Sequence, residues 1–177
     1  LVAAIELERA GYAPMIIEAT DRVGGRVKSD RESGIPLDHG FQVLLSAYPE
    51  AQKYLDYDQL NLIRFEPGSI IYQNGRKQKI GDPLRNASFL WPTLMAGVGS
   101  LRDKLLILRL SNKLKKKRIE AIFSTPEVPT LDYLRDFGFS NRIIDNFFQP
   151  FFAGIYLEED LTTSSRMFEF VYKMFGT

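Results

Sequence analysis

The stretch EATDRVGGR, residues 18–26, decides the fold predicted for this chain. It follows the apolar run Met15-Ile16-Ile17, which is typical of a buried strand, and Glu18 places a carboxylate at the end of that run. In a dinucleotide-binding fold a carboxylate at this position accepts hydrogen bonds from ribose hydroxyls. The alternative interpretation is a solvated charge that closes a strand and has no ligand.

The second half of the same stretch suits an anionic ligand. Gly24 and Gly25 allow backbone N–H groups to come close to a bound molecule, and Arg26 offers a cation for a phosphate. A flexible loop with an exposed arginine is the simpler alternative. The residue types by themselves leave both interpretations open.

The residues before this stretch predict the second half of a βαβ unit. A helix over residues 1–10 ends at Gly11, and a short buried strand over residues 13–18 follows it. No G-x-G-x-x-G occurs in the chain. We therefore expect the first strand and its glycine-rich turn to lie before Leu1, and the chain to be an incomplete piece of a longer protein.

The rest of the chain predicts a mixed region of hairpins followed by helices. A hairpin is expected about Ser33-Gly34 and another about the turn Asn74-Gly75. We expect a boundary near residue 60, with a partial FAD-binding domain over residues 1–59 and a partial substrate-binding domain over 60–177. The further predicted elements are a helix at 49–55, strands at 60–65, 69–72 and 77–80, and helices at 101–123, 131–137 (capped by Thr130 and stopped by Gly138), 141–148 (interrupted by Pro150) and 165–175.

Composition excludes several classes of site. The 177 residues carry a net charge of +1 and contain no cysteine and one histidine, His39, so thiolate catalysis, disulfides and a histidine-based metal site or triad are not expected. The balanced charge gives no reason to expect a nucleic-acid partner. No apolar stretch reaches the roughly 18–20 residues of a membrane span, and the first residues lack the basic region typical of a signal peptide. The expected location is cytoplasmic, with peripheral membrane association as the alternative.

Three segments in order carry a family resemblance. Residues 18–26, the segment GIPLDHGFQ at 34–42 and the segment QPFFAGIY at 149–156 resemble signatures of FAD-containing amine oxidases, protoporphyrinogen oxidases and phytoene desaturases. The resemblance implies an α/β fold: a Rossmann-like FAD-binding domain, incomplete here, joined to a substrate domain of mixed sheet and helices. It also implies that a C-terminal FAD segment lies beyond Thr177, so we expect residues 1–177 alone to bind FAD weakly or not at all.

The resemblance assigns cofactor contacts but no catalytic residue. Glu18 would hold the adenosine ribose, residues 24–26 would lie along the pyrophosphate and ribityl chain, and residues 40–42 would approach the flavin. Asp38 is equally well explained as a turn residue, and His39 as a structural residue. The implied FAD contacts are Glu18, Gly24, Gly25, Arg26, Gly40, Phe41 and Gln42.

The implied activity is oxidation of an organic substrate by hydride transfer to FAD. Many aromatic residues after residue 60 favour a bulky lipophilic substrate, such as a polyene, a porphyrinogen or an amine, although most are equally well explained as core. The aromatic and bulky residues in question are Phe89, Leu90, Trp91, Phe147, Phe148, Phe151, Phe152 and Tyr156. The alternative function is a non-catalytic binding protein on the same scaffold, similar to Rab GDP-dissociation inhibitors.

A basic run suggests one further partner. Lys113 and residues 115–118 (Lys-Lys-Lys-Arg) lie at the end of the predicted long helix, close in sequence to an apolar segment around Trp91. Cations at a helix C-terminus complement its dipole, which accounts for the run without a partner. A peripheral contact with an anionic membrane is the alternative hypothesis.

Overall fold

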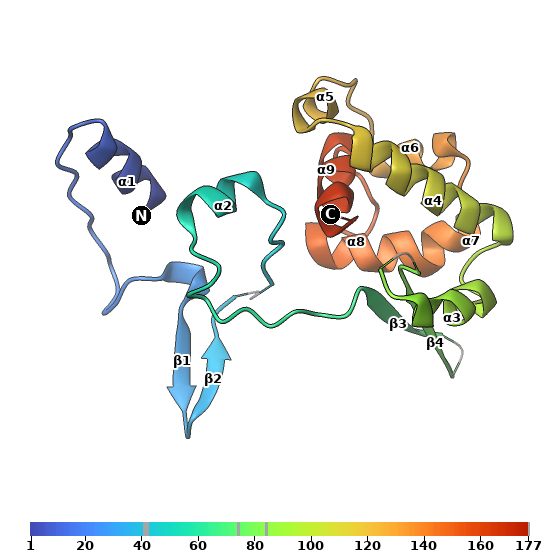
Figure 1. Ribbon diagram of the computed structural model, residues 1–177, viewed down its shortest axis with the longest axis horizontal. Coiled ribbons are helices and arrows are strands. Elements are labelled where there is room, and N and C mark those ends of the chain that lie inside the picture. The colour runs from blue at the N-terminus through green and yellow to red at the C-terminus, as the bar shows by residue number, and fades with distance from the viewer. Residues whose placement is uncertain (41–42, 74, 84, 177) are drawn as a thin grey trace. The chain divides into compact units, whose positions relative to one another are not determined.

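The computed structural model describes residues 1–40, 43–73, 75–83 and 85–176, and the chain divides into two compact units (Figure 1). The N-terminal unit is Leu1–Leu60 and the C-terminal unit is Asn61–Thr177. The described strands form two separate antiparallel hairpins, and the longer helices belong to the C-terminal unit.

The N-terminal unit consists of short elements joined by irregular chain. Its described side chains are all exposed or half-buried, so these residues form no hydrophobic core. The hydroxyl of Tyr54 donates to Glu6 Oε1 at 2.9 Å and links the last helix of the unit to the first. The elements are α1 (Val2–Arg9), η1 (Gly25–Val27), β1 (Ser29–Glu32), β2 (Ile35–Asp38) and α2 (Pro49–Tyr54).

The prediction of a buried strand at residues 13–18 is wrong for this structure. The segment is irregular, and Met15 and Ile17 are 86% and 87% exposed. A parallel strand needs neighbouring strands for its backbone hydrogen bonds and a helical layer to cover it. No described strand pairs with this segment, so the parallel sheet of a Rossmann-like domain is not formed by the described residues.

The hairpin predicted about Ser33-Gly34 is confirmed. Strands β1 and β2 pair in antiparallel register from Ser29 opposite Asp38 to Glu32 opposite Ile35. The two turn residues have positive φ, 52° at Ser33 and 83° at Gly34, as a tight two-residue hairpin turn requires. The local turn signal was therefore sufficient to define the register.

The second hairpin belongs to the C-terminal unit and is formed by β3 (Gly68–Gln73) and β4 (Arg76–Gly81). The predicted turn residue Asn74 lies outside the described residues. The strand predicted at 60–65 is wrong: this segment is a turn followed by irregular chain, with Ile63 84% exposed and without a partner strand among the described residues. Apolar residues alone do not hold a strand that has nothing to pair with.

Phe89 anchors the second hairpin. It lies in the short helix η2 (Ala87–Phe89) and is buried against the open end of the hairpin, where Gly68 pairs with Gly81. A Cβ built on Gly68 or Gly81 would lie 2.7 Å or 2.3 Å from the Phe89 ring. The absence of a side chain at these two positions therefore allows the ring to pack directly on the backbone of the strands.

The core of the C-terminal unit is an aromatic and aliphatic cluster between helices (Figure 1). Phe148 lies at its centre, with ring centroids 4.8 Å from Phe139, 6.0 Å from Phe168 and 6.5 Å from Phe152. The helices are α3 (Leu90–Met95), α4 (Leu101–Lys116), α5 (Ile119–Phe123), α6 (Thr130–Phe137), α7 (Asn141–Ile143), η3 (Ile144–Phe148), α8 (Gln149–Tyr156) and α9 (Ser165–Gly176).

Two predicted helix boundaries need correction. The helix predicted over 101–123 is divided into α4 and α5, because Lys173 donates to the carbonyls of Leu114 and Lys115 and so satisfies the end of α4. Thr130 is not a cap: it lies at the first helical position of α6, and its hydroxyl donates to the carbonyl of Thr163 at 2.6 Å. The predicted stop at Gly138, with φ of 101°, is confirmed.

Pro150 does not interrupt the helix as predicted. The chain remains helical from Asn141 to Tyr156, with a π turn, η3, immediately before α8. Proline has no N–H to donate to the carbonyl of Asn146, four residues earlier, and its ring crowds that carbonyl. The wider turn accommodates both effects, so the helix continues past the proline.

A buried carboxylate joins two helix N-termini. Asp103 accepts hydrogen bonds from the backbone N–H and the hydroxyl of Ser100, at 2.8 and 2.7 Å, and from the same groups of Ser140, at 2.9 and 2.8 Å. Burial by itself raises the pKa of Asp103, but these hydrogen bonds outweigh burial, and the net pKa lies below its usual value. Ser100 and Ser140 cap α4 and α7, so one carboxylate fixes both helix starts.

We expect Asp103→Asn to lower the free energy of unfolding by about 2 kcal/mol at neutral pH, because an amide replaces a charged acceptor. The folded-state pKa of Asp103 is below its unfolded value. The stabilisation is therefore complete above the unfolded pKa and is lost as pH falls through the folded pKa. Urea denaturation of both proteins from pH 7 downward should show the difference shrinking in acid. The exposed Asp136→Asn is the control, and equal losses in the two variants would contradict the assignment.

Candidate functional site

The carboxylate of Glu18 is held by the residues that follow it. Its Oε1 accepts the backbone N–H of Thr20 at 2.9 Å and lies 2.8 Å from the Thr20 hydroxyl. The backbone hydrogen bond from Thr20, supported by the hydroxyl, lowers the pKa of Glu18, and the Ala19 backbone and the charge of Lys28 act in the same direction. Both hydrogen bonds from Thr20 end on Oε1 and not on Oε2. The side chain is thus an ionised acceptor with one oxygen available to a ligand.

The two glycines form the sharp bend before η1. Gly24 and Gly25 have φ of 125° and 51°, and the Val27 N–H donates to the carbonyl of Gly24 at 3.0 Å. A Cβ on Gly25 would have no atom within 4 Å, so the space beside this backbone is open. Arg26 is exposed and forms no hydrogen bond or ion pair within the described part of the chain. The bend therefore presents open backbone and a cation without an acidic partner there.

Gly40 lies directly against this bend. A Cβ on Gly40 would lie 2.5 Å from the carbonyl oxygen of Arg26, a distance that no side chain tolerates. The end of β2 therefore packs against the backbone of η1, and it does so only because residue 40 is glycine. Phe41 and Gln42, the other residues predicted here, lie outside the described residues.

A polar cluster that the sequence did not indicate holds the bend on the hairpin. Arg22 donates to the Ser29 carbonyl at 2.9 Å and to the Asp30 carboxylate, and His39 Nε2 lies 2.6 Å from the other oxygen of Asp30. The hydrogen bond with His39, together with Arg22, lowers the pKa of Asp30. Arg22 and Asp30 are eight residues apart and meet because the chain bends back at residues 24–27, whereas the hairpin brings His39 to Asp30. Asp38 accepts from Ser29 across the hairpin, which agrees with a structural role.

The donors and acceptors of this unit fit a dinucleotide. A carboxylate with a spare oxygen suits ribose hydroxyls, while glycine backbone and an unpaired arginine suit a pyrophosphate. The structure brings residues 24–26 and Gly40 together through the hairpin. FAD contains both ribose and pyrophosphate, so the described part of the predicted residue set is chemically suitable for it.

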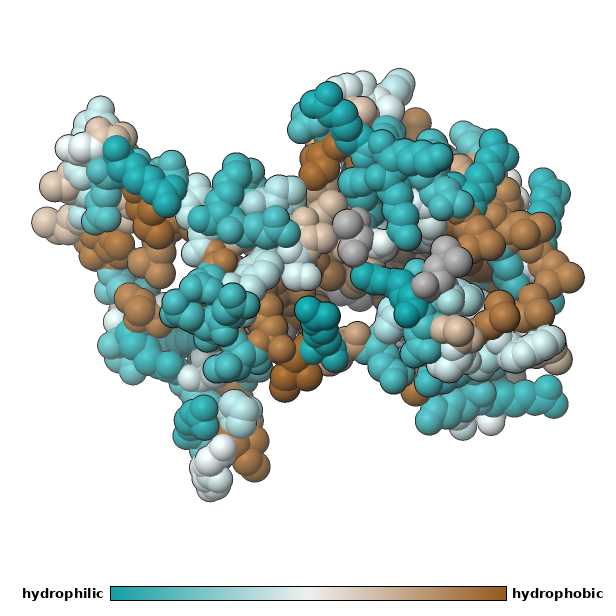
Figure 2. Space-filling model, viewed as in Figure 1, coloured by the Kyte–Doolittle hydropathy of each residue, from teal (hydrophilic) through white to brown (hydrophobic). Residues whose placement is uncertain are grey.

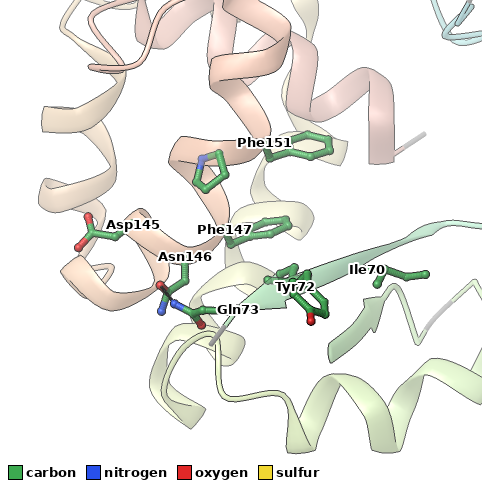
Figure 3. Close-up of a pocket in the computed structure, with 9 residues that line it drawn as sticks. Ile70, Tyr72, Gln73, Asp145, Asn146, Phe147 and Phe151 are labelled. Carbon is green, nitrogen blue, oxygen red and sulfur yellow. Dashed lines mark hydrogen bonds between the residues drawn. The ribbon is translucent and has the colours of Figure 1, made fainter. Parts of the chain in front are cut away.

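The predicted aromatic residues of the C-terminal unit divide into three groups. Phe89, Phe148 and Phe152 are buried in the core, as the simpler interpretation held. Trp91 and Leu90 are exposed, at 69% and 52%. Of the remaining three, Tyr156 packs against the core, while Phe147 and Phe151 line a cleft of about 350 Å³ together with residues of β3 (Figure 3).

Part of the basic run forms ion pairs within the C-terminal unit. Lys117 forms an ion pair with the buried carboxylate of Glu169, and Lys113 lies 3.6 Å from it. The hydroxyl of Tyr133 donates to the same carboxylate at 2.8 Å, and burial together with this bond raises the pKa of Tyr133. Lys115 and Lys116 are exposed. Lys113 and Lys117 therefore have a structural explanation, and Arg118 forms an exposed ion pair with Glu120.

Comparison with known proteins identifies the class. The chain belongs to the family of flavin-containing amine oxidoreductases, whose family model matches residues 1–176. FAD is accordingly the cofactor of its family, and the resemblance seen in the three motif segments is confirmed.

A particular relative comes from a plant. The chain is 26% identical over 155 residues to protoporphyrinogen oxidase 2, chloroplastic/mitochondrial, of Arabidopsis thaliana, and the match covers 87% of this chain. The chain spans only 30% of that relative's length. No solved structure matches the chain. Among the described residues, no helix has both the length and the apolar character that crossing a membrane requires.

We expect Gly40→Ala to reduce flavin retention strongly in the protein expressed from its full coding sequence, since the added Cβ must push the Arg26 backbone away. Gly11→Ala is the matched control: Gly11 lies outside the proposed FAD contacts, its Cβ meets open space, and the change adds only the strain of a left-handed alanine, about 1 kcal/mol. Flavin absorbance per mole of purified protein measures the effect. Equal flavin content in the two variants would argue against the packing of Gly40 on Arg26 as the cause.

Proposed function

We propose that this chain is part of an FAD-dependent oxidoreductase that oxidises a bulky, lipophilic organic substrate by hydride transfer to the flavin. The observation that carries the proposal is the family match over residues 1–176, together with the ionised Glu18 and the open glycine bend at residues 24–26. Bound FAD supplies the hydride acceptor, which no side chain can supply.

The roles of the residues follow from their chemistry. Glu18 Oε2 accepts hydrogen bonds from the adenosine ribose, and the bend at residues 24–26 faces the pyrophosphate, with Arg26 as its cation. Gly40 fixes the path of the chain toward residues 41 and 42, which approach the flavin. In this proposal the N-terminal unit is a partial FAD-binding domain and the C-terminal unit a partial substrate domain. No described residue is proposed as a catalytic acid or base.

A non-catalytic binding protein on the same scaffold, similar to Rab GDP-dissociation inhibitors, is the alternative. Such a protein has no need of a ribose acceptor with a spare oxygen or of an unpaired arginine beside open backbone. Both features are present here, so the structure favours the flavoenzyme. Retention of FAD by the purified protein separates the two.

We expect Glu18→Ala to weaken FAD binding by about ten- to a hundredfold in the protein made from its full coding sequence, the effect of losing a hydrogen bond to a charged acceptor. Quenching of flavin fluorescence during titration measures the affinity. Glu32→Ala, an exposed glutamate of β1, is the control and should bind normally. Unchanged affinity in Glu18→Ala would remove the ribose assignment.

A peripheral contact with an anionic membrane is proposed for one face of α4. Leu101, Leu105 and Leu108 are 64%, 68% and 42% exposed and recur at helical spacing. Lys115 and Lys116 continue the same face one to two turns farther on. Figure 2 shows apolar and charged side chains side by side on the surface of this unit. An apolar stripe next to unpaired cations suits a headgroup layer.

Charge reversal of Lys115 and Lys116 together should weaken co-sedimentation with phosphatidylserine-containing vesicles at least about tenfold, because each cation contributes about 1 kcal/mol at such a surface. Lys117 is left unchanged, since its loss would leave Glu169 buried without its ion pair. Arg76→Glu with Lys77→Glu, on the β3–β4 hairpin, is the control of equal charge. If the two double variants co-sediment with the vesicles equally well, α4 is not the membrane contact.

A further inference from the structure

The cleft of the C-terminal unit lies between the β3 strand and the π turn of the long helix. Phe147 and Phe151 come from the helical side, and Ile70 and Tyr72 come from the strand (Figure 3). Its volume of about 350 Å³ lies at the lower end of the range for ligand sites, roughly 300–1,000 Å³. The cleft can therefore take a section of a large molecule.

The two sides of the cleft are flat and apolar. The rings of Phe147 and Phe151 are stacked, with centroids 5.8 Å apart and planes inclined by 18°. Opposite them, Tyr72 is 75% exposed and Ile70 is 59% exposed, so neither side chain is used by the core. Large side chains left uncovered on both sides of one cavity provide apolar contact area for a ligand.

The π turn positions the side chains that form the helical side of the cleft. Residues 145–147 belong to η3, where the chain is widened ahead of Pro150. Such turns occur often at functional sites, because they shift side chains out of the regular helical positions. Here the shift turns Asn146 toward Gln73 on the strand, and these two amides meet at 2.6 Å at one end of the cleft.

The amide side chains at the polar end of the cleft carry no charge, and most of their hydrogen-bonding groups have partners. Gln73 donates to Asn146 Oδ1, and Asn146 Nδ2 donates weakly to the Val98 carbonyl at 3.4 Å. Within the described residues, Gln73 Oε1 accepts no hydrogen bond and remains as a single acceptor. Asp145 is the one charged residue among those that line the cleft, and its carboxylate is directed away from the rings in Figure 3.

The lining directs no charged group at the rings, and this distinguishes between substrate classes. A tetrapyrrole with carboxylate groups needs cations, and an amine that binds as an ammonium needs an anion or its equivalent. The lining contains no cation, and its one anion, Asp145, is directed away from the rings, so it suits a planar conjugated hydrocarbon that carries at most a hydroxyl. We propose that this cleft binds an uncharged, conjugated section of the substrate, so that the substrate belongs to the polyene class.

This inference rests on the proposed function for its link to oxidation, but the binding step can be measured separately. The protein is made from its full coding sequence and titrated with β-carotene in detergent micelles, with protoporphyrin IX as the anionic ligand and benzylamine as the cationic ligand. Induced visible circular dichroism reports polyene binding, and flavin absorbance is read in the same samples. Polyene binding at least tenfold tighter than that of either charged ligand is expected.

Two variants locate the binding. Tyr72→Lys brings a cation into the cleft, with Lys77 as its cross-strand neighbour, and should weaken polyene binding at least tenfold. Tyr12→Lys, also an exposed tyrosine, is the matched control and should bind as the wild type does.

Each contrary result has a defined meaning. Tighter binding of protoporphyrin IX or benzylamine than of the polyene overturns the substrate class. Equal polyene binding by Tyr72→Lys and Tyr12→Lys overturns the cleft as the site. A protein that holds FAD but fails these tests leaves the oxidoreductase proposal intact, whereas one that binds the polyene in the cleft without holding FAD contradicts that proposal and not the cleft.

Discussion

The packing of aromatic rings around Phe148 is the interaction on which the C-terminal unit depends. Phe148 is buried at the end of the π turn and touches rings from the loop before α7, from α8 and from α9. Burying such a ring contributes about 1.5–3 kcal/mol relative to exposure, and ring pairs add to this. Because Phe148 must point inward, Phe147 beside it must point elsewhere, and it lines the cleft. Core and candidate substrate site therefore share one turn of helix.

The N-terminal unit depends on a different kind of interaction. Its described residues have no buried core, and the bend at residues 24–26 is held by polar contacts: Arg22 and His39 converge on Asp30, and Gly40 packs on the backbone of Arg26. Exposed ion pairs of this kind contribute little stability, typically below about 1 kcal/mol. These contacts instead fix the path of the chain around the bend. That path leaves Glu18, the glycine backbone and Arg26 available for a cofactor.

Much of the local structure was predictable, and the two strand predictions that are wrong share one cause. The Ser33-Gly34 hairpin, the stop at Gly138 and the last helix follow from short-range rules of turn and cap chemistry. The strands expected at 13–18 and 60–65 depend on partners that the described residues do not provide. In the candidate site, Glu18, the glycines and Arg26 were visible as a motif. Arg22 and Asp30 were not, because their contact exists only after the chain has bent back at residues 24–27.

The sequence by itself determined the family and the cofactor chemistry, since residues 18–26, 34–42 and 149–156 carry their signatures in consecutive positions. The tertiary structure alone decided which aromatic residues are core and which line a cleft, and which lysines of the basic run are paired. The physical reason is that burial and ion pairing are properties of contacts between distant segments. Phe147 and Phe148 are identical in sequence terms, and only the packing of α9 against η3 and α8 separates their roles.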